Sequence, residues 1–199
     1  MLKILFIGAL LGMLLYFSFS RLKRSFGTAS IKKIRPGYIS IEADPTDTKR
    51  AIRSTALTVG TGGILLLIIL LLGLKIKILL ILLPIALYLI CQIFLLANHM
   101  NAIRKRKVWF NPQTSDLWIE DSAQGNYSVN IYRDITAVKS IGAIQQNRDV
   151  FFGYHELMTT KGSIRLSSLL SENRQNNFFF DTLRDGFDVK PHRSLFPLL

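Results

Sequence analysis

Hydrophobic residues gather in three long runs before residue 98, and beyond residue 107 they occur in short alternating stretches. The runs cover residues 4–19, 56–74 and 78–97, and none of them contains a charged side chain. An α-helix rises about 1.5 Å per residue, so the second and third runs are each long enough to cross a hydrocarbon core of about 30 Å. One helix through both would be about twice that length, so we predict a helical hairpin over residues 56–97.

Basic residues around this hairpin predict its orientation. Only Lys75 and Lys77 lie near its tip, whereas basic residues cluster on both flanks. Because basic flanks are retained in the cytoplasm, both ends of the hairpin are expected on the cytoplasmic side. We favour this topological role over a dedicated lipid site, although each base near anionic head groups would add about 1 kcal/mol of attraction. The flanking bases are Lys49, Arg50 and Arg53 before the hairpin, and Arg104, Lys105, Arg106 and Lys107 after it.

The first apolar run is either a cleaved signal peptide or a retained membrane span. The small residues at its end are poor cleavage positions, and Arg21, Lys23 and Arg24 come directly after it. Such a distribution opposes export of the downstream chain, so we interpret residues 1–20 as an uncleaved helix with its N-terminus outside. Residues 21–55 then form a basic cytoplasmic linker. Within it, residues 38–42 alternate like a strand that either docks on the soluble domain or lies on the membrane surface.

The remainder of the chain predicts a soluble domain of strands followed by one helix. Turn residues separate the strand-like segments, and Lys161-Gly162 is a typical hairpin turn. Ser171 is a suitable helix N-cap and Gly186 a suitable C-terminal residue, with Phe179, Phe180 and Leu183 on one face between them. The predicted strands are residues 107–111, 117–120, 127–132, 135–141, 151–160 and 163–166.

Charge and cysteine content exclude several classes of protein. The net charge is +12 and the isoelectric point is about 10.1, which would suit a nucleic-acid-binding protein. However, residues 108–199 contain nine basic and ten acidic side chains, so the positive charge flanks the apolar runs and the predicted domain is not basic. We therefore expect no nucleic-acid partner. Cys91, the single cysteine, lies inside an apolar run and provides no disulfide or thiolate metal site.

A search for reactive groups predicts no enzyme, no metal and no cofactor. His99, His155 and His192 are widely separated, and no zinc, P-loop, dinucleotide or nucleophile-elbow motif is present. We expect His155 at an ordinary position in the domain. His99, near Asn98 and Asn101, is expected as a polar residue at the membrane interface, with a head-group contact as the alternative.

Three aromatic residues of the first strand pair have two interpretations. Trp109, Phe110 and Trp118 could form an exposed patch for a protein partner or pin the domain to the bilayer interface. Alternatively, they fill the core, which we favour because a domain of this size needs bulky side chains to bury enough apolar surface.

Two strings within the domain carry a resemblance to a known family. They are YRDITAVKSIGA at 132–143 and YHELMTTKGSIRLSSLL at 154–170, and an aromatic helix comes after them. This order resembles the bacterial pleckstrin-homology (PH)-like domains that follow two-span membrane hairpins, over about residues 108–188, or 54–188 with the hairpin. Inositol-phosphate-binding relatives carry a basic cluster in the first hairpin, whereas residues 111–116 contain no Lys or Arg, so this mode of binding is not expected.

The resemblance implies a fold class and a location. We expect α-helical transmembrane segments plus a C-terminal α+β PH-like domain, a bent antiparallel β-barrel capped by a C-terminal helix, over residues 108–190. Residues 191–199 are then a tail. The location implied is the bacterial inner membrane, with the C-terminal domain in the cytoplasm.

Three functions are compatible with this organisation. The favoured one is a non-enzymatic adaptor that presents the domain to a protein partner by an edge strand or the aromatic patch. The alternatives are a sensor of anionic lipid or envelope stress, which would use the basic flanks, and an accessory subunit whose spans pack into a transport or secretion complex.

Overall fold

The computed structural model describes residues 36–73, 76–122, 125–144, 152–160 and 162–199. The chain divides into two compact units. Among the described residues, one unit contains Ile52–Ala97, and the other contains the segment up to Ala51 together with Asn98–Leu199. The predicted span at residues 1–20 and most of the predicted linker lie outside the described residues.

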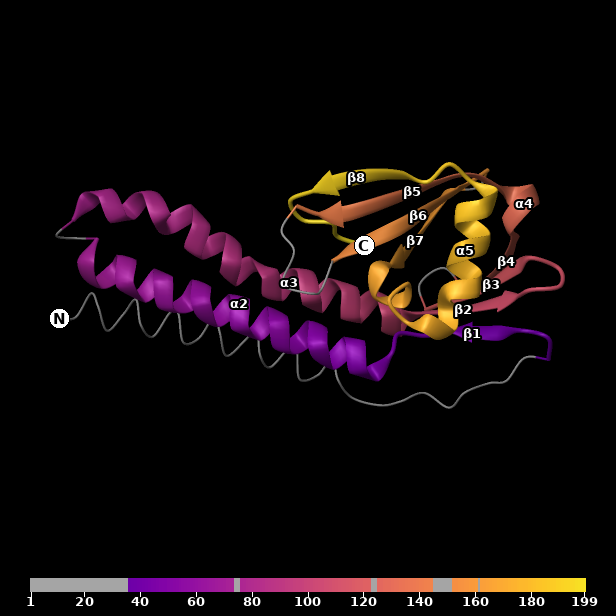
Figure 1. Cartoon of the computed structure of the whole chain (residues 1–199), viewed down its shortest axis with the longest axis horizontal. Coiled ribbons are helices and arrows are strands. Elements are labelled where there is room, and N and C mark those ends of the chain that lie inside the picture. The colour runs from indigo at the N-terminus through magenta and orange to yellow at the C-terminus, as the bar shows by residue number, and fades with distance from the viewer. Residues whose placement is uncertain (1–35, 74–75, 123–124, 145–151, 161) are drawn as a thin grey trace. The chain divides into compact units, whose positions relative to one another are not determined.

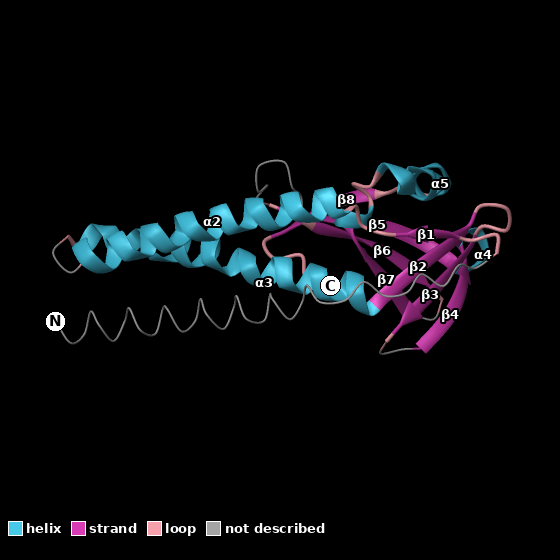
Figure 2. Ribbon diagram, turned by 90° about the horizontal axis from the view of Figure 1, so that it is seen from below, coloured by secondary structure: helices cyan, strands magenta, loops and turns pink. Residues whose placement is uncertain are grey.

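The first unit is a helical hairpin. Helix α2 spans Pro45–Leu72, a short 3-10 helix η1 spans Lys77–Leu82, and helix α3 spans Leu83–Lys105. Figures 1 and 2 show α2 and α3 side by side near the turn that connects them, and Figure 2 shows them diverging farther from it. Both helical segments are long and apolar enough to cross a membrane. Both also extend beyond the predicted apolar runs, because Asp44 caps α2 by accepting a hydrogen bond from the Thr46 amide and α3 continues through the basic run.

A narrow contact surface joins the two helices of the hairpin. Leu66 and Ile69 of α2 pack with Ala86 and Ile90 of α3 in a small buried cluster. Gly62 lies at a close approach of the two helices, since an added Cβ would meet Leu89 Cβ at 2.7 Å. Many other large apolar side chains of both helices point away from the hairpin and are exposed: Ile64, Leu67, Leu71, Ile78, Ile81 and Ile85.

The second unit begins with an antiparallel sheet of order β1-β2-β3-β4. Strand β1 spans Ile39–Ile41, β2 Arg106–Asn111, β3 Asp116–Asp121 and β4 Gly125–Asn130. Strand β1 comes from the predicted linker and pairs with β2, with Ile39 opposite Phe110. The linker strand therefore docks on the domain, which was one of the two alternatives.

A second four-stranded sheet has the order β7-β6-β5-β8. Strand β5 spans Ile135–Ala143, β6 Gly153–Thr159, β7 Gly162–Ser167 and β8 Lys190–Ser194. The first three are antiparallel, but β8 runs parallel to β5. The treatment of residues 191–199 as a tail is corrected here, since residues 190–194 are a strand. In the described part of the chain no strand joins the two sheets, so the expected antiparallel barrel is not closed.

Two predicted element boundaries were wrong for local reasons. The strand expected through Tyr132 ends at Asn130, whose side chain accepts hydrogen bonds from two later amides and starts the short helix α4, Ile131–Asp134. Ser171 is not the N-cap of the last helix. Two 3-10 turns, η2 at Ser168–Leu170 and η3 at Arg174–Asn176, precede helix α5, which spans Asn177–Gly186.

The core of the second unit lies between its two sheets. It joins residues of both sheets with one face of α5, where Phe179, Phe180 and Leu183 are buried as predicted. Asn176 fixes the start of α5, because its side chain donates to the carbonyls of Glu42 and Leu170. The largest core side chains from the sheets include Phe110, Leu117, Ile119, Leu157 and Leu166.

Candidate functional site

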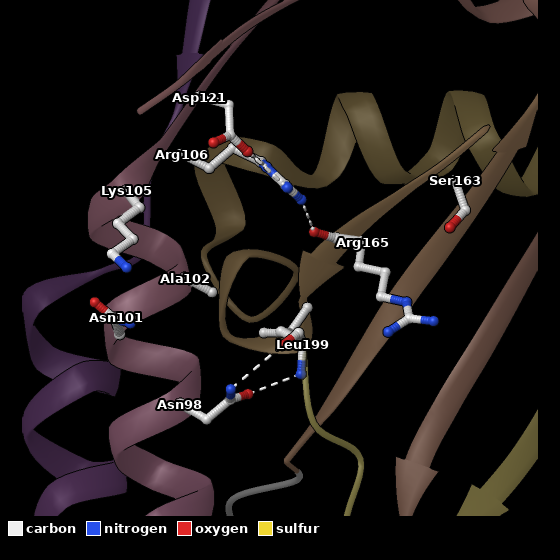
Figure 3. Close-up of a pocket in the computed structure, with 9 residues that line it drawn as sticks. All are labelled: Asn98, Asn101, Ala102, Lys105, Arg106, Asp121, Ser163, Arg165 and Leu199. Atoms are coloured by element: carbon white, nitrogen blue, oxygen red, sulfur yellow. Dashed lines mark hydrogen bonds and ion pairs between the residues drawn. The ribbon is translucent and has the colours of Figure 1, made fainter. Parts of the chain in front are cut away.

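A polar cavity lies in the second unit, where α3 gives way to β2. Its volume is about 430 Å³. One wall is a single face of α3, because Asn98, Asn101, Ala102 and Lys105 follow the spacing i, i+3, i+4, i+7. The other residues that line it come from β2, β3, β7 and the C-terminal segment, and Figure 3 shows Lys105 and Asn101 on the α3 side of the cavity and Arg165 and Ser163 on the β7 side. We refer to it as the α3 cavity.

An ion pair forms one end of the α3 cavity. Arg106 and Asp121 lie opposite each other on β2 and β3. Arg106 Nη2 lies 2.7 Å and Nε 2.8 Å from Asp121 Oδ2. Arg106 Nη1 donates to the carbonyl of Arg165 on β7 at 2.6 Å, so one guanidinium connects the two sheets (Figure 3). Since both charges are largely buried, the pair contributes a fixed and nearly neutral wall.

Arg165 is positioned by its neighbours on β6. Its Nε donates to Glu156 Oε1 at 3.0 Å, and its guanidinium lies over the ring of Tyr154 at 5.3 Å. The hydrogen bond to Glu156 raises the pKa of Arg165, which stays fully charged. The side chain is still 44% exposed, so its outer donors face the solvent.

Lys105 is the unpaired cation of the α3 cavity. Its side chain is exposed, and no carboxylate of the described residues lies within ion-pair distance of it. The backbone carbonyl of Lys105 accepts a hydrogen bond from the amide of Ser122 at 3.0 Å. At this point the end of α3 therefore presents the lysine ammonium group and not a free carbonyl. Asn101, one turn earlier on the same face, is also exposed.

The C-terminal segment is hydrogen-bonded to α3 along the cavity. Asn98 donates to the carbonyl of Leu199 at 3.3 Å and accepts its amide at 2.7 Å. His99 is fully buried, contrary to the interfacial position expected for it. Its Nε2 lies 2.9 Å from the Pro197 carbonyl and its Nδ1 2.8 Å from Ser167 Oγ. Because a carbonyl only accepts, Nε2 is the donor and Nδ1 accepts from the serine hydroxyl.

A second opening lies between one edge strand of each sheet, β4 and β7. Within the described residues β4 pairs only with β3 and β7 only with β6. A groove of about 460 Å³ lies between these two strands, with Ser128 on β4 and Ile164 on β7 among its lining residues. Arg133 and Asp134 of α4 lie at one end, bonded to each other at 3.1 Å. Alternate backbone groups of an edge strand have no ladder partner, so this edge groove offers donors and acceptors to an added strand.

The predicted basic run is divided between two elements. Arg104 and Lys105 end α3, whereas Arg106 and Lys107 begin β2. Lys105 and Arg106 line the α3 cavity, and Arg104 and Lys107 do not line it. The three bases predicted before the hairpin, Lys49, Arg50 and Arg53, lie on α2, where Arg50 is bonded to Asp47 at 3.3 Å and Arg53 is exposed.

The three aromatic residues proposed as a partner patch do not share one face. Phe110 is a core residue opposite Leu117, and its ring lies 5.2 Å from that of Phe179. Trp109 and Trp118 lie opposite each other on the other face of the sheet. Trp109 is 5% exposed, so it is buried like Phe110 although it lies on the opposite face of the sheet.

Sequence reasoning missed most of the α3 cavity. The i, i+3, i+4, i+7 spacing of residues 98, 101, 102 and 105 was the available signal, since it places two amides and a lysine on one helical face. Asp121 and Arg165 carry no such signal, because they reach the cavity through strand pairing.

Comparison with known proteins gives no family for this chain: no family model, no curated protein and no solved structure matches it.

Proposed function

We propose that this chain is an integral membrane protein that uses a cytoplasmic PH-like domain as a non-enzymatic adaptor for a protein partner. In this proposal α2 and α3 cross the bacterial inner membrane as a hairpin with both ends in the cytoplasm. The partner adds an extended segment to the edge groove between β4 and β7.

Exposure of the hairpin supports its place in a membrane. Only 28% of the most apolar window of each helix is buried, whereas the core helix of a soluble protein would be covered on most sides. Exposed leucine and isoleucine side chains on this scale are stable in lipid and promote aggregation in water. The bases before α2 and at the end of α3 favour cytoplasmic ends.

The edge groove is the observation on which the adaptor function rests. Soluble proteins normally protect sheet edges, and here two edges face the same opening. An extended peptide gains affinity by main-chain hydrogen bonds to such an edge and specificity from alternate side chains. The groove combines buried apolar positions, Val129 and Ile164, with exposed polar ones such as Ser128, which suits a peptide of alternating apolar and polar residues.

Site-specific photocrosslinking tests the adaptor function in native membranes. Ser128 and Thr160 both line the groove. A photoreactive residue placed at either position should crosslink to the same protein and give one discrete adduct. Arg193 on β8 is the matched control. It is exposed, and β8 lies at the opposite edge of its sheet from β7, so a photoreactive residue at Arg193 should not form this adduct. The crosslinked segment, added as a peptide, should slow amide exchange in residues 125–130 and 162–167. Equal labelling at all three positions, or no protection by the peptide, would contradict the proposal.

The α3 cavity favours a second candidate function, contact with anionic lipid. The α3 cavity places cationic side chains at the end of a proposed membrane helix, which favours contact with anionic lipid head groups. The cavity is therefore a second candidate binding site, separate from the edge groove.

A further inference from the structure

We infer that a group of apolar side chains after β8 inserts into the surface of the lipid bilayer. The group consists of Ile144, Leu195, Phe196 and Leu198, and we refer to it as the apolar anchor. None of the four lines the edge groove or the α3 cavity. The inference goes beyond the adaptor function and rests on the proposed membrane position of α3. It gives the domain a second attachment to the membrane besides the helix itself.

The side chains of the apolar anchor are exposed and lie close together. Leu195, Phe196 and Leu198 fall within four consecutive residues and are each 38–58% exposed. Ile144, which is 53% exposed, lies beside them because its amide donates to the carbonyl of Ser194 at 3.0 Å. Single exposed apolar residues are ordinary on a soluble protein, whereas a contiguous group marks a contact with another protein or with a membrane.

Main-chain groups of this segment are hydrogen-bonded within the domain. The Leu198 amide donates to the Phe196 carbonyl at 2.9 Å, which closes a three-residue turn centred on Pro197. The Pro197 carbonyl accepts a hydrogen bond from His99 Nε2 at 2.9 Å. Lipid chains offer no hydrogen bonds, so a segment whose polar groups are paired internally can present its apolar side chains to a bilayer.

Contacts with α3 place the segment at the end of the proposed membrane span. The charge-free run ends at Ala97, and Asn98 and His99 are the next two residues of the same helix. They lie within about 3 Å of the end of the run along the axis, inside a head-group layer that is roughly 5–8 Å thick. Asn98 bonds both main-chain groups of Leu199 (Figure 3), and His99 bonds Pro197. The apolar anchor is therefore held at the level where interfacial apolar side chains are buried.

The composition of β8 favours lipid over an added strand as the occupant. Strand β8 lies at one edge of its sheet, where Lys190 and Pro191 oppose pairing with another strand. Residues 189–199 contain two bases, Lys190 and Arg193, and no acidic residue. Both bases are exposed. Bases next to exposed apolar side chains are typical of segments that lie on an anionic lipid surface.

Fluorescence quenching in vesicles tests the inference with the full-length chain. Cys91 is the single cysteine, so Cys91→Ala allows one thiol-reactive fluorophore to be placed at Leu198→Cys. The purified protein is reconstituted in vesicles of phosphatidylcholine and phosphatidylglycerol. Iodide quenches from the water, and lipids with a nitroxide on the acyl chain quench from the bilayer. We expect residue 198 to be quenched by the lipid nitroxide, and its quenching by iodide to be several-fold weaker than that of an exposed control position.

Two other label positions are the controls. Thr160→Cys is exposed and precedes β7, whereas Ser167, which contacts His99, ends this strand about 16 Å away. A label at residue 160 should be quenched by iodide and not by lipid. Leu67→Cys replaces an exposed apolar residue in the charge-free run of α2 and should be quenched by the lipid nitroxide.

A substitution beside the label tests the contribution of the neighbouring side chain. Phe196→Ser removes apolar surface and should raise iodide quenching at residue 198 several-fold, because insertion becomes weaker. Phe196→Leu keeps an apolar side chain and should leave the quenching unchanged. Phe196 is exposed, so neither change should prevent folding.

Three results would overturn the inference. Equal iodide quenching at residues 198 and 160 would show that the segment faces water. Protection of residue 198 from both quenchers would show that protein covers it. Lipid quenching at residue 67 without lipid quenching at residue 198 would reject the apolar anchor and leave the membrane proposal intact, whereas its absence at both positions would reject the two together. The vesicles contain no partner protein, so the result does not depend on the adaptor function.

Discussion

Arg106 and Asp121 face each other across β2 and β3, and the same Arg106 guanidinium donates to the Arg165 carbonyl on β7. One side chain thus bonds to both sheets. Since the sheets share no strand among the described residues, this is one of the polar connections that hold their relative position.

Removal of Arg106 should therefore destabilise the domain. Arg106→Met removes the ion pair with Asp121, which is 7% exposed. Breaking an ion pair at a buried carboxylate is costly, and partial exposure of Arg106 reduces the loss, so we expect the free energy of unfolding to fall by about 2 kcal/mol. Denaturant unfolding followed by tryptophan fluorescence measures this difference.

A charge-matched control separates the Arg106 contacts from general charge loss. Lys107→Met, at the next position of β2, should change the unfolding free energy by less than about 0.5 kcal/mol. Equal effects of the two substitutions would show that the Arg106 contacts do not stabilise the domain. The double variant Arg106→Met with Asp121→Asn should recover part of the loss, because the buried charge is then removed.

Gly62 permits the close approach of α2 and α3. A valine there should strain the hairpin, since its Cβ alone would lie within 2.7 Å of Leu89 Cβ. Overpacking of this kind typically destabilises by about 1–3 kcal/mol. Gly62→Val should lower the melting midpoint of the helical circular dichroism signal in detergent. Gly60 has open space around its Cβ position, so Gly60→Val is the matched control, and an equal shift would contradict the packing of these helices.

Sequence patterns predicted the strands and helices in which apolar residues recur at a regular spacing. The alternation around Trp109 and Leu117 predicted β2 and β3, and the apolar spacing predicted the buried face of α5. Strand β8 was missed because the segment KPHRS has no apolar alternation and pairs with β5 through its backbone. The start of α5 was misplaced because Ser171 resembles an N-cap although it closes a 3-10 turn.

Local sequence patterns did not predict the contacts between segments that lie far apart in the chain. The α3 cavity depends on Arg165, which lies 59 residues after Arg106 and meets it through a hydrogen bond between the two sheets. His99 was expected at a wet interface because polar residues commonly end a membrane helix. Its burial depends on Pro197 and Ser167, whose positions are set by the fold of the whole unit.

Asn98 should control the order of the C-terminal segment. It bonds both main-chain groups of Leu199, so Asn98→Ala removes two hydrogen bonds at once. We expect faster hydrogen exchange in a peptide covering residues 195–199, measured by mass spectrometry, with little change in β2 or β3. Asn101→Ala lies one turn later on the same helix without a bond to Leu199 and should leave exchange in this peptide unchanged. Equal exchange in both variants would show that Asn98 does not hold the segment.

His155 should make the stability of the domain depend on pH. It lies on β6 with its ring 5.1 Å from that of Phe180 and its Nε2 3.4 Å from Ser171 Oγ. Burial lowers the pKa of His155 from 6.5 to about 4, and the positive charge of Arg184 contributes to this shift. The folded domain therefore holds His155 neutral over a range in which the unfolded chain protonates it.

The sign of the effect depends on proton binding. Between pH 6.5 and about 4 the unfolded chain binds more protons at this position, so stability falls as pH falls through this window and levels off below it. The difference amounts to at most about 3 kcal/mol. His155→Phe keeps the ring contact with Phe180 and removes the titrating group, so its unfolding free energy should fall less between about pH 7 and about pH 4.5. Parallel pH profiles for the two proteins, measured by denaturant unfolding with tryptophan fluorescence, would show that His155 is protonated equally in the folded and unfolded states.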